Sequence, residues 1–186
     1  MKKNILVISG HPNLENSLAN RIILRELHEL LPNLKIRYLD KIVSDGELDI
    51  AEEQDALLEA DIVVFQFPLH WYSYPALLKN YLDQVFLHGF AYGSKTKLAG
   101  KTLLHSFTAG APSEAYRTKG VLQHPISDFT IPFQVTTNYC QMQYVDPVYT
   151  CGCLYIPNIH TKEDAYLIQE KCLNHAHRLY QELISL

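Results

Sequence analysis

The sequence lacks a long apolar run and a strong net charge, and both absences narrow its possible partners. The first apolar stretch, residues 5–8, is far shorter than the apolar region of a signal peptide, so we expect a cytoplasmic protein without membrane insertion. Sixteen Lys and Arg stand against 20 Asp and Glu, a formal charge of -4. This balance favours a neutral small-molecule ligand over nucleic acid or an anionic membrane.

Cysteine is scarce and its spacing is unsuited to a metal or redox site. The four cysteines, Cys140, Cys151, Cys153 and Cys172, form one C-x-C pair and no C-x-x-C pair. We therefore interpret them as reduced thiols, mostly in the core. No group of His, Asp or Glu has ligand spacing, so we predict no metal.

Apolar runs alternate regularly with helix-periodic segments along the 186 residues, which are long enough for one domain, residues 1–186. Strands are predicted over 5–9, 34–39, 61–67, 102–108 and 142–151, and helices over 18–31, 49–60, 75–85, 130–140 and 165–183. Residues 40–48 are expected to be a loop. Such alternation predicts a doubly wound α/β fold, with a five-stranded parallel sheet in the order 2-1-3-4-5 and helices on both faces.

In this fold the ligand site lies outside the carboxyl ends of the strands, where the strand order reverses. The loop after the first strand reads GHPNLENSLAN and contains neither the dinucleotide fingerprint nor a P-loop. It does open a helix whose free N–H groups can hold an anion, with His11 and Ser17 as further donors. A monophosphate suits this arrangement. The alternative is that Asn16 or Ser17 only caps the helix.

The loop after the third strand, PLHWYSYP, is rich in rings where a connecting loop is usually small and polar. Trp71 and Tyr72, with His70 and successive backbone N–H groups, suit a flat heteroaromatic ring such as a flavin. The alternative is that these rings pack against neighbouring helices. After the fourth strand, TAGAP supplies small residues that permit close backbone approach, and Tyr116 follows. We expect these loops to converge on one ligand.

Three segments, GHPNLENSLAN, the stretch from residue 49 to 93 and TAGA, together resemble the flavodoxin-like NAD(P)H:quinone oxidoreductases, in particular the short bacterial branch of the general stress protein 14 and potassium-efflux ancillary type. The resemblance covers nearly the whole chain. It implies a flavodoxin-like fold, bound FMN (with FAD as the alternative) and NAD(P)H as co-substrate. It places the flavin phosphate at His11, Ser17, Leu18, Ala19 and Asn20. It places the flavin ring at Pro68, Leu69, His70, Trp71, Tyr72, Thr108, Ala109, Gly110 and Ala111.

Two departures from the family pattern concern the ring site. The family has a Thr-Thr-Gly-Gly type sequence where this chain has Thr108 to Ala111, and the partner histidine of the tyrosine has only His124 as an approximate counterpart. The aromatic segment 86–93 is either a plug over a helix end or a dimer interface. We expect Phe90 and Tyr92 to expose ring surface and, as the resemblance implies, to contact substrate in the neighbouring chain of a homodimer.

The expected activity is therefore transfer of two electrons from NAD(P)H to quinones or similar aromatic acceptors by a ping-pong mechanism, with Tyr116 as the catalytic hydrogen-bond donor. A response-regulator receiver is excluded, because Gly10-His11 and Phe67-Pro68 stand where that class needs acids. A flavodoxin-type electron carrier usually has a strongly acidic docking surface, which this composition does not favour. A redox-sensing regulatory subunit with peripheral contact to a potassium efflux transporter remains the alternative.

Overall fold

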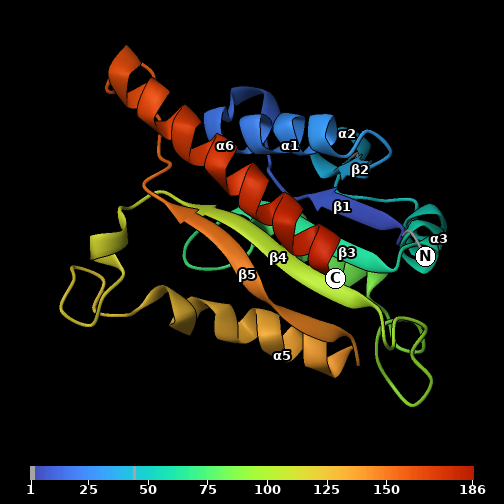
Figure 1. Cartoon of the computed structure of the whole chain (residues 1–186). Coiled ribbons are helices and arrows are strands. Elements are labelled where there is room, and N and C mark those ends of the chain that lie inside the picture. Colours follow the sequence, from blue (N-terminus) through green and yellow to red (C-terminus); the bar gives the residue numbers. More distant parts are fainter. Residues whose placement is uncertain (1–2, 44) are drawn as a thin grey trace.

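The computed structural model, which describes residues 3–43 and 45–186, is built around one sheet of five parallel strands in the order β2-β1-β3-β4-β5 (Figure 1). The strands are β1 (Ile5–Ser9), β2 (Lys35–Tyr38), β3 (Ile62–Pro68), β4 (Thr102–Ala109) and β5 (Gln143–Cys151). All pairings are parallel. The predicted fold class and strand order are confirmed, and the strand boundaries differ from the predicted ones by one residue at most.

Helices cover both faces of the sheet (Figure 1). The α-helices are α1 (Leu18–Leu30), α2 (Leu39–Ile42), α3 (Ile50–Glu59), α4 (Ala76–Val85), α5 (Ile131–Tyr139) and α6 (Lys162–Ser185), and the 3₁₀ helices are η1 (Leu14–Asn16), η2 (Ser113–Ala115) and η3 (Ile126–Thr130). Helices α1 and α6 pack together on one face, while α2 to α5 share the apolar core of the other face. Parallel sheets require cover on both faces because their strands are apolar on both sides.

The expectation of a loop over 40–48 was wrong at its start, where the short helix α2 lies. Leu39 is fully buried in the core, and the carboxylate of Asp40 accepts a hydrogen bond from the backbone N–H of Leu14 at 3.0 Å. Both contacts hold this turn against the segment that follows β1. The local turn therefore serves to position the first ligand loop.

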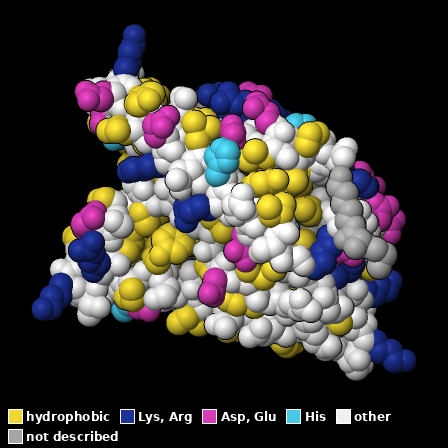
Figure 2. Space-filling model, in the orientation of Figure 1, with side chains coloured by type: hydrophobic (Ala, Val, Ile, Leu, Met, Phe, Trp, Pro, Cys, Tyr) yellow, Lys and Arg dark blue, Asp and Glu magenta, His cyan; other side chains and the backbone are white. Residues whose placement is uncertain are grey.

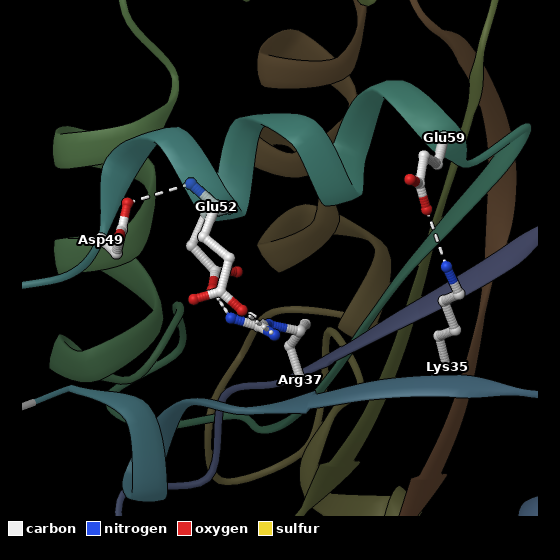
Figure 3. A network of polar contacts seen from close by, with 6 residues as sticks. Lys35, Arg37, Asp49, Glu52 and Glu59 are labelled. Atoms are coloured by element: carbon white, nitrogen blue, oxygen red, sulfur yellow. Dashed lines mark hydrogen bonds and ion pairs between the residues drawn. The ribbon is translucent and has the colours of Figure 1, made fainter.

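Asp49 and Glu52 have the sequence form of a capping box at the start of α3, but only half of the box forms. The Asp49 carboxylate caps the helix by accepting from the backbone N–H of Glu52 at 3.0 Å. The Glu52 carboxylate, however, accepts from Arg37 on β2 at 2.9 Å instead of turning back to the cap (Figure 3). A complete capping box occurs at the start of α6, between Thr161 and Asp164. The pairing of Glu52 with Arg37 thus attaches α3 to the edge strand.

The two ends of the described chain lie together at the amino-terminal edge of the sheet, opposite the carboxyl ends of the strands (Figure 1). The Lys3 ammonium donates a hydrogen bond to the main-chain oxygen of Leu186. Within residues 3–43 and 45–186, no helix combines the length and apolarity that a membrane crossing requires. The four cysteines are free, as predicted.

Candidate functional site

A cavity of about 240 Å³ lies at the carboxyl ends of β1, β3 and β4, at the predicted switch point. It is lined by His11, Asn16, Ser17, Leu18, Ala19, Asn20, Pro68, Leu69, His70, Thr108, Gly110, Cys153, Leu154 and Tyr155. The structure thus brings together residues of all three predicted loops. Four predicted cofactor residues do not line this cavity: Trp71, Tyr72, Ala109 and Ala111. In Figure 2, hydrophobic side chains gather in a hollow between the start of α6 and the loop before α5.

A larger cavity, of about 580 Å³, lies at the opposite edge, between the amino ends of β1 and β2 and the ends of α1 and α3. Doubly wound sheets bind their ligands at the carboxyl ends of the strands. We therefore assign the candidate site to the smaller cavity, where the donor groups converge.

The N-terminus of α1 supplies a set of neutral donors to the cavity. The Ser17 hydroxyl caps the helix by accepting from the backbone N–H of Asn20 at 3.1 Å, which leaves its own hydrogen free to be donated. Burial, and then the neighbouring His70, lower the pKa of His11 to about 4, so its ring is neutral at pH 7. Its Nδ1 accepts from the backbone N–H of Asn13 at 3.0 Å, which places the ring hydrogen on Nε2. Ser17 is therefore a cap and an available donor at once.

Gly10 begins this loop because helix α4 approaches it closely. A Cβ atom on residue 10 would lie 2.8 Å from the Cβ of Leu78, closer than real side chains approach one another. The backbone N–H of Gly10 donates to the Gln66 carbonyl at 2.9 Å. The loop after β1 is thus held against β3, the strand that carries the aromatic loop.

The aromatic loop after β3 contains a tight turn with two bulky residues in a strained conformation. His70 and Ser73 exchange both backbone hydrogen bonds, at 3.1 and 3.0 Å. The central residues, Trp71 and Tyr72, have φ values of +48° and +65°, where Asn and Gly are usually found. Trp71 is 92% exposed. Strain of this kind is characteristic of ligand-binding segments, and it presents the indole to solvent beside the cavity.

Phe129 joins the aromatic loop to Tyr116, and the sequence analysis did not single it out. The Tyr72 ring stacks on Phe129 with centroids 5.0 Å apart, and Tyr116 meets Phe129 edge-on at 6.0 Å. Burial, and then Cys151 and Tyr72, raise the pKa of Tyr116, so its hydroxyl remains protonated as a donor. His124 bonds to Asp128 at 2.9 Å and lies 6.3 Å from the Phe129 ring. Tyr116 lies beside the cavity, not in its lining.

The expectation that Phe90 exposes its ring was wrong. Phe90 is only 5% exposed and belongs to the main core, because the chain folds back over it and its carbonyl accepts from Lys97 and Thr96 at 2.7 and 2.8 Å. Tyr92 is half-buried and stacks on Tyr139 of α5 with centroids 5.2 Å apart. Within the segment 86–93, Phe90 therefore acts as a buried plug, whereas Tyr92 keeps part of its ring surface exposed.

The family model of the flavodoxin-like fold matches residues 3–171, most of the chain and all of the cavity lining. The chain belongs to this flavodoxin-like family. It is 40% identical over 152 residues to general stress protein 14 of Bacillus subtilis, covering 81% of this chain and 86% of the relative. It is 38% identical over 161 residues to the uncharacterised NAD(P)H oxidoreductase YrkL of the same bacterium, covering 86% and 92%.

Two further relatives extend the comparison within the flavodoxin-like family. The glutathione-regulated potassium-efflux system ancillary protein KefG of Cronobacter sakazakii is 39% identical over 145 residues, covering 77% of this chain and 78% of that protein. The crystal structure of general stress protein 14 from Treponema denticola in complex with FMN has a TM-score of 0.85 at 26% identity and covers 97% of this chain and 99% of that one. The predicted resemblance is thus confirmed.

In this member of the flavodoxin-like family, a buried row of polar side chains adjoins the cavity, and most of it escaped the sequence analysis. Asn20 and Thr108 line the cavity and are joined by a hydrogen bond of 3.1 Å. Behind them lie Gln66, Ser106 and His175, all with no exposed surface. Their only sequence signal is a polar residue inside otherwise apolar strands and helices.

Proposed function

We propose that this protein is an FMN-dependent NAD(P)H oxidoreductase that passes two electrons from a nicotinamide to a quinone or a similar aromatic acceptor. The observation that carries the proposal is the convergence of the α1 N-terminus, the strained aromatic turn and the small-residue loop after β4 on one edge of the sheet. Two relatives support the same class of function: YrkL is named an NAD(P)H oxidoreductase, and the protein from Treponema denticola was crystallised in complex with FMN.

The donor set of the cavity fits the phosphate of FMN. Free backbone N–H groups at the start of α1, the Ser17 hydroxyl and the Nε2–H of neutral His11 all face one small space, together with Leu18, Ala19 and Asn20. Its volume, about 240 Å³, is below the roughly 300–1,000 Å³ of pockets that enclose a whole drug-sized ligand. We assign it to the phosphate and ribityl part, which favours FMN over FAD.

The ring site is assigned to the surface beside this cavity, at Pro68 to Tyr72 and Thr108 to Ala111. A flavin bound there would supply the chemistry of hydride transfer between the nicotinamide and the acceptor. The chain has to hold the ring, exclude water and donate hydrogen bonds. Trp71 supplies a free aromatic face, the loop N–H groups supply fixed dipoles, and the protonated Tyr116 donates to the acceptor oxygen.

A ping-pong order follows if the protein loops cover one face of the flavin, because donor and acceptor then use the other face in turn. Initial rates measured against NAD(P)H at several quinone concentrations give parallel double-reciprocal lines in that case. Intersecting lines, which require a ternary complex, contradict a shared face.

We also propose a homodimer, because α5 presents an exposed apolar row beside the site. Ile131, Val135 and Tyr139 recur at four-residue spacing and are exposed, and Tyr139 carries the stacked ring of Tyr92. A partner chain seated there places Tyr92 at the acceptor end of the neighbouring site. Phe90, being buried, acts only as support for this segment.

The second candidate function is a redox-sensing regulatory subunit of a potassium efflux transporter. Its support is the 39% identity to KefG over 77% of this chain. The two candidates share the flavin site and differ in turnover. A sensor binds flavin and accepts hydride but turns over slowly with every quinone offered, whereas a reductase turns over rapidly with at least one.

The deciding experiment is the absorbance spectrum of the purified protein, followed by release and identification of any yellow cofactor. We expect one FMN per chain, recovered directly or after reconstitution. Recovery of FAD alone contradicts the choice of nucleotide. Failure to bind either flavin at micromolar concentrations contradicts the site itself.

A further inference from the structure

The polar row on the α1 and α6 face of the sheet crosses the central strands β3 and β4 in register. Gln66 pairs with Ser106, so their side chains point to the same face. One apolar cluster, which contains Val64 and Leu179, lies on one side of the row, and another, which contains Ile23 and Ala176, lies on the other. Burying polar groups in such a place is costly unless they are hydrogen-bonded.

From Ser106 to the cavity, every hydrogen bond is donated in the same direction. Ser106 Oγ donates to Gln66 Oε1 at 2.6 Å, Gln66 Nε2 donates to Asn20 Oδ1 at 2.9 Å, and Asn20 Nδ2 donates to Thr108 Oγ1 at 3.1 Å. Thr108 accepts at the end of this series, so its own hydroxyl hydrogen is still available. Among the described residues no acceptor is found for that hydrogen, and Thr108 lines the cavity.

The other half of the row fixes the tautomer of His175. Ser106 has given its only hydrogen to Gln66, so at 2.7 Å from His175 Nε2 it must accept, and Nε2 must carry the ring hydrogen. Burial, and then Arg178, lower the pKa of His175 to about 3, so the ring is neutral and Nδ1 is bare. Thr150 Oγ1 lies 2.9 Å from Nδ1 and therefore donates to it, while accepting at 2.8 Å from Arg178.

We propose that His175 is a positioning residue which, held in its Nε2–H tautomer by Thr150 and the exposed Arg178, orients the Thr108 hydroxyl as a donor to the molecule bound in the cavity. Arg178 can only donate, so it occupies one of the two lone pairs of Thr150 Oγ1, and its positive charge disfavours a second N–H donor there. The reverse direction would turn both amides, move the ring hydrogen to Nδ1 and leave a lone pair at Thr108. The proposal rests on the proposed flavin site for the identity of the acceptor, whereas the direction of the row is a property of the flavin-free protein.

If the row had only a structural role, the groups at both of its ends would form hydrogen bonds to other protein groups. This row begins at a surface cation and ends at an unused hydroxyl hydrogen in the candidate site. Chains of hydrogen bonds polarise one another, so a donor at the end of such a series is stronger than an isolated hydroxyl. His175 therefore acts on the site through Ser106 and Thr108 without touching the ligand.

The first test reads the tautomer directly, in flavin-free protein labelled with nitrogen-15 at histidine. We expect the His175 ring to show Nε2–H at pH 7. In Arg178→Leu the Nδ1–H form should become more populated, because the cation that disfavours a second donor at Thr150 Oγ1 is gone, and Arg178→Lys should restore Nε2–H. Nδ1–H in the unmodified protein, or an unchanged tautomer in Arg178→Leu, overturns the proposal. This test does not depend on flavin binding.

The second test measures FMN affinity in a double-mutant cycle. Thr108→Val removes the terminal donor and should weaken binding roughly 2- to 10-fold. Ser106→Ala should weaken it about 2-fold or more, because the two directions are then both populated and only one is competent. Since Ser106 acts through Thr108, adding Ser106→Ala to Thr108→Val should have no further effect. Thr137→Val, which deletes an equally buried hydroxyl in α5, is the matched control and should leave affinity unchanged.

The outcomes of these tests distinguish the positioning role of His175 from the proposed oxidoreductase function. Equal factors for Ser106→Ala in both backgrounds mean that Ser106 supports the fold only, and they overturn the positioning role. Tight FMN binding that is unchanged in both Ser106→Ala and Thr108→Val also overturns the positioning role. It leaves the oxidoreductase proposal intact. A wild-type protein that binds no flavin, yet shows the Nε2–H tautomer and its dependence on Arg178, contradicts the flavin site and not the oriented row.

Discussion

The ring of Tyr72 stacks on the ring of Phe129, with centroids 5.0 Å apart and 27° between the planes. Phe129 thereby fixes the strained turn and, through its edge-on contact, Tyr116. Aromatic pairs of this kind contribute about 0.5–1.5 kcal/mol beyond burial. We expect Phe129→Ala to weaken FMN binding several-fold and to lower turnover more strongly. Val121→Ala, an exposed apolar residue of the same segment, is the control for fluorescence titration and steady-state rates.

Relief of the strain at Trp71 should stabilise the protein and impair the site. A non-glycine residue in the left-handed region costs roughly 1–2 kcal/mol, and Asn tolerates that region best. Trp71→Asn should therefore raise the free energy of unfolding by about 1 kcal/mol while weakening binding of flavin or acceptor. Gln123→Asn, at another left-handed position (φ +57°), should stabilise without affecting the flavin. A destabilised Trp71→Asn contradicts the interpretation of the turn as strained.

Ser17 caps α1 and is proposed to bind the flavin phosphate, and substitution can separate these two roles. Ser17→Ala removes the cap of α1, which costs about 0.5–2 kcal/mol of stability, and also a hydrogen bond to phosphate worth roughly 1.5–3 kcal/mol. Ser17→Asp retains a cap but places a negative charge beside the phosphate, so it should remain as stable as the wild type and bind FMN far more weakly. Asp49→Ala, which removes the cap of α3, should lose stability alone. Unchanged FMN affinity in Ser17→Asp leaves Ser17 as a cap only.

The buried His105 makes stability depend on pH. Burial lowers its pKa to about 3, against 6.5 for a free histidine, so between these values the unfolded state binds a proton that the folded state does not. Stability should therefore rise with pH in this window and fall as the solution is acidified. One such group contributes about 1.4 kcal/mol per pH unit.

Urea unfolding at several pH values between 4 and 6 checks the contribution of His105. His105→Phe should reduce the slope of stability against pH by about 1.4 kcal/mol per pH unit. Phe133→Leu, a substitution of the ring stacked on His105, should lower stability by the same amount at every pH. An unchanged slope in His105→Phe means that the buried ring titrates alike in both states. His11 and His175, whose pKa values are also lowered, should account for much of the remaining slope.

The exposed row on α5 predicts the oligomeric state. Val135→Glu places a charge in the middle of this row and should convert a dimer to a monomer in sedimentation velocity. Leu167→Glu, at an equally open position on α6, should leave the dimer intact. A wild-type monomer with full quinone reductase activity contradicts the proposed role of Tyr92 in a neighbouring site.

The fold was predictable because its three central strands, β1, β3 and β4, are largely apolar runs and its long helices have clear three- and four-residue periodicity. Helix α2 was missed because the four residues Leu39–Ile42 are too few to show a period. Convergence of the three ligand loops was predictable for a simple reason: parallel strands end at one edge.

The remaining parts of the site depend on contacts that no local pattern encodes. Phe129 meets Tyr72 from a segment without periodicity. The polar row needs the register of Gln66 beside Ser106, which sequence alone does not fix. Phe90 was misplaced because the hydrogen bonds from Lys97 and Thr96 to its carbonyl, which fold the chain over it, leave no local pattern in the sequence.

The contact between Lys3 and Leu186 makes this fold a natural subject for circular permutation. These two residues lie at the edge of the sheet that faces away from the cavity, so a short linker between them does not cross a ligand loop. New ends can then be opened elsewhere, and the order in which the strands are synthesised changes while their arrangement does not. Either end is likewise suited to attachment on a surface or electrode, with the candidate site turned toward solution.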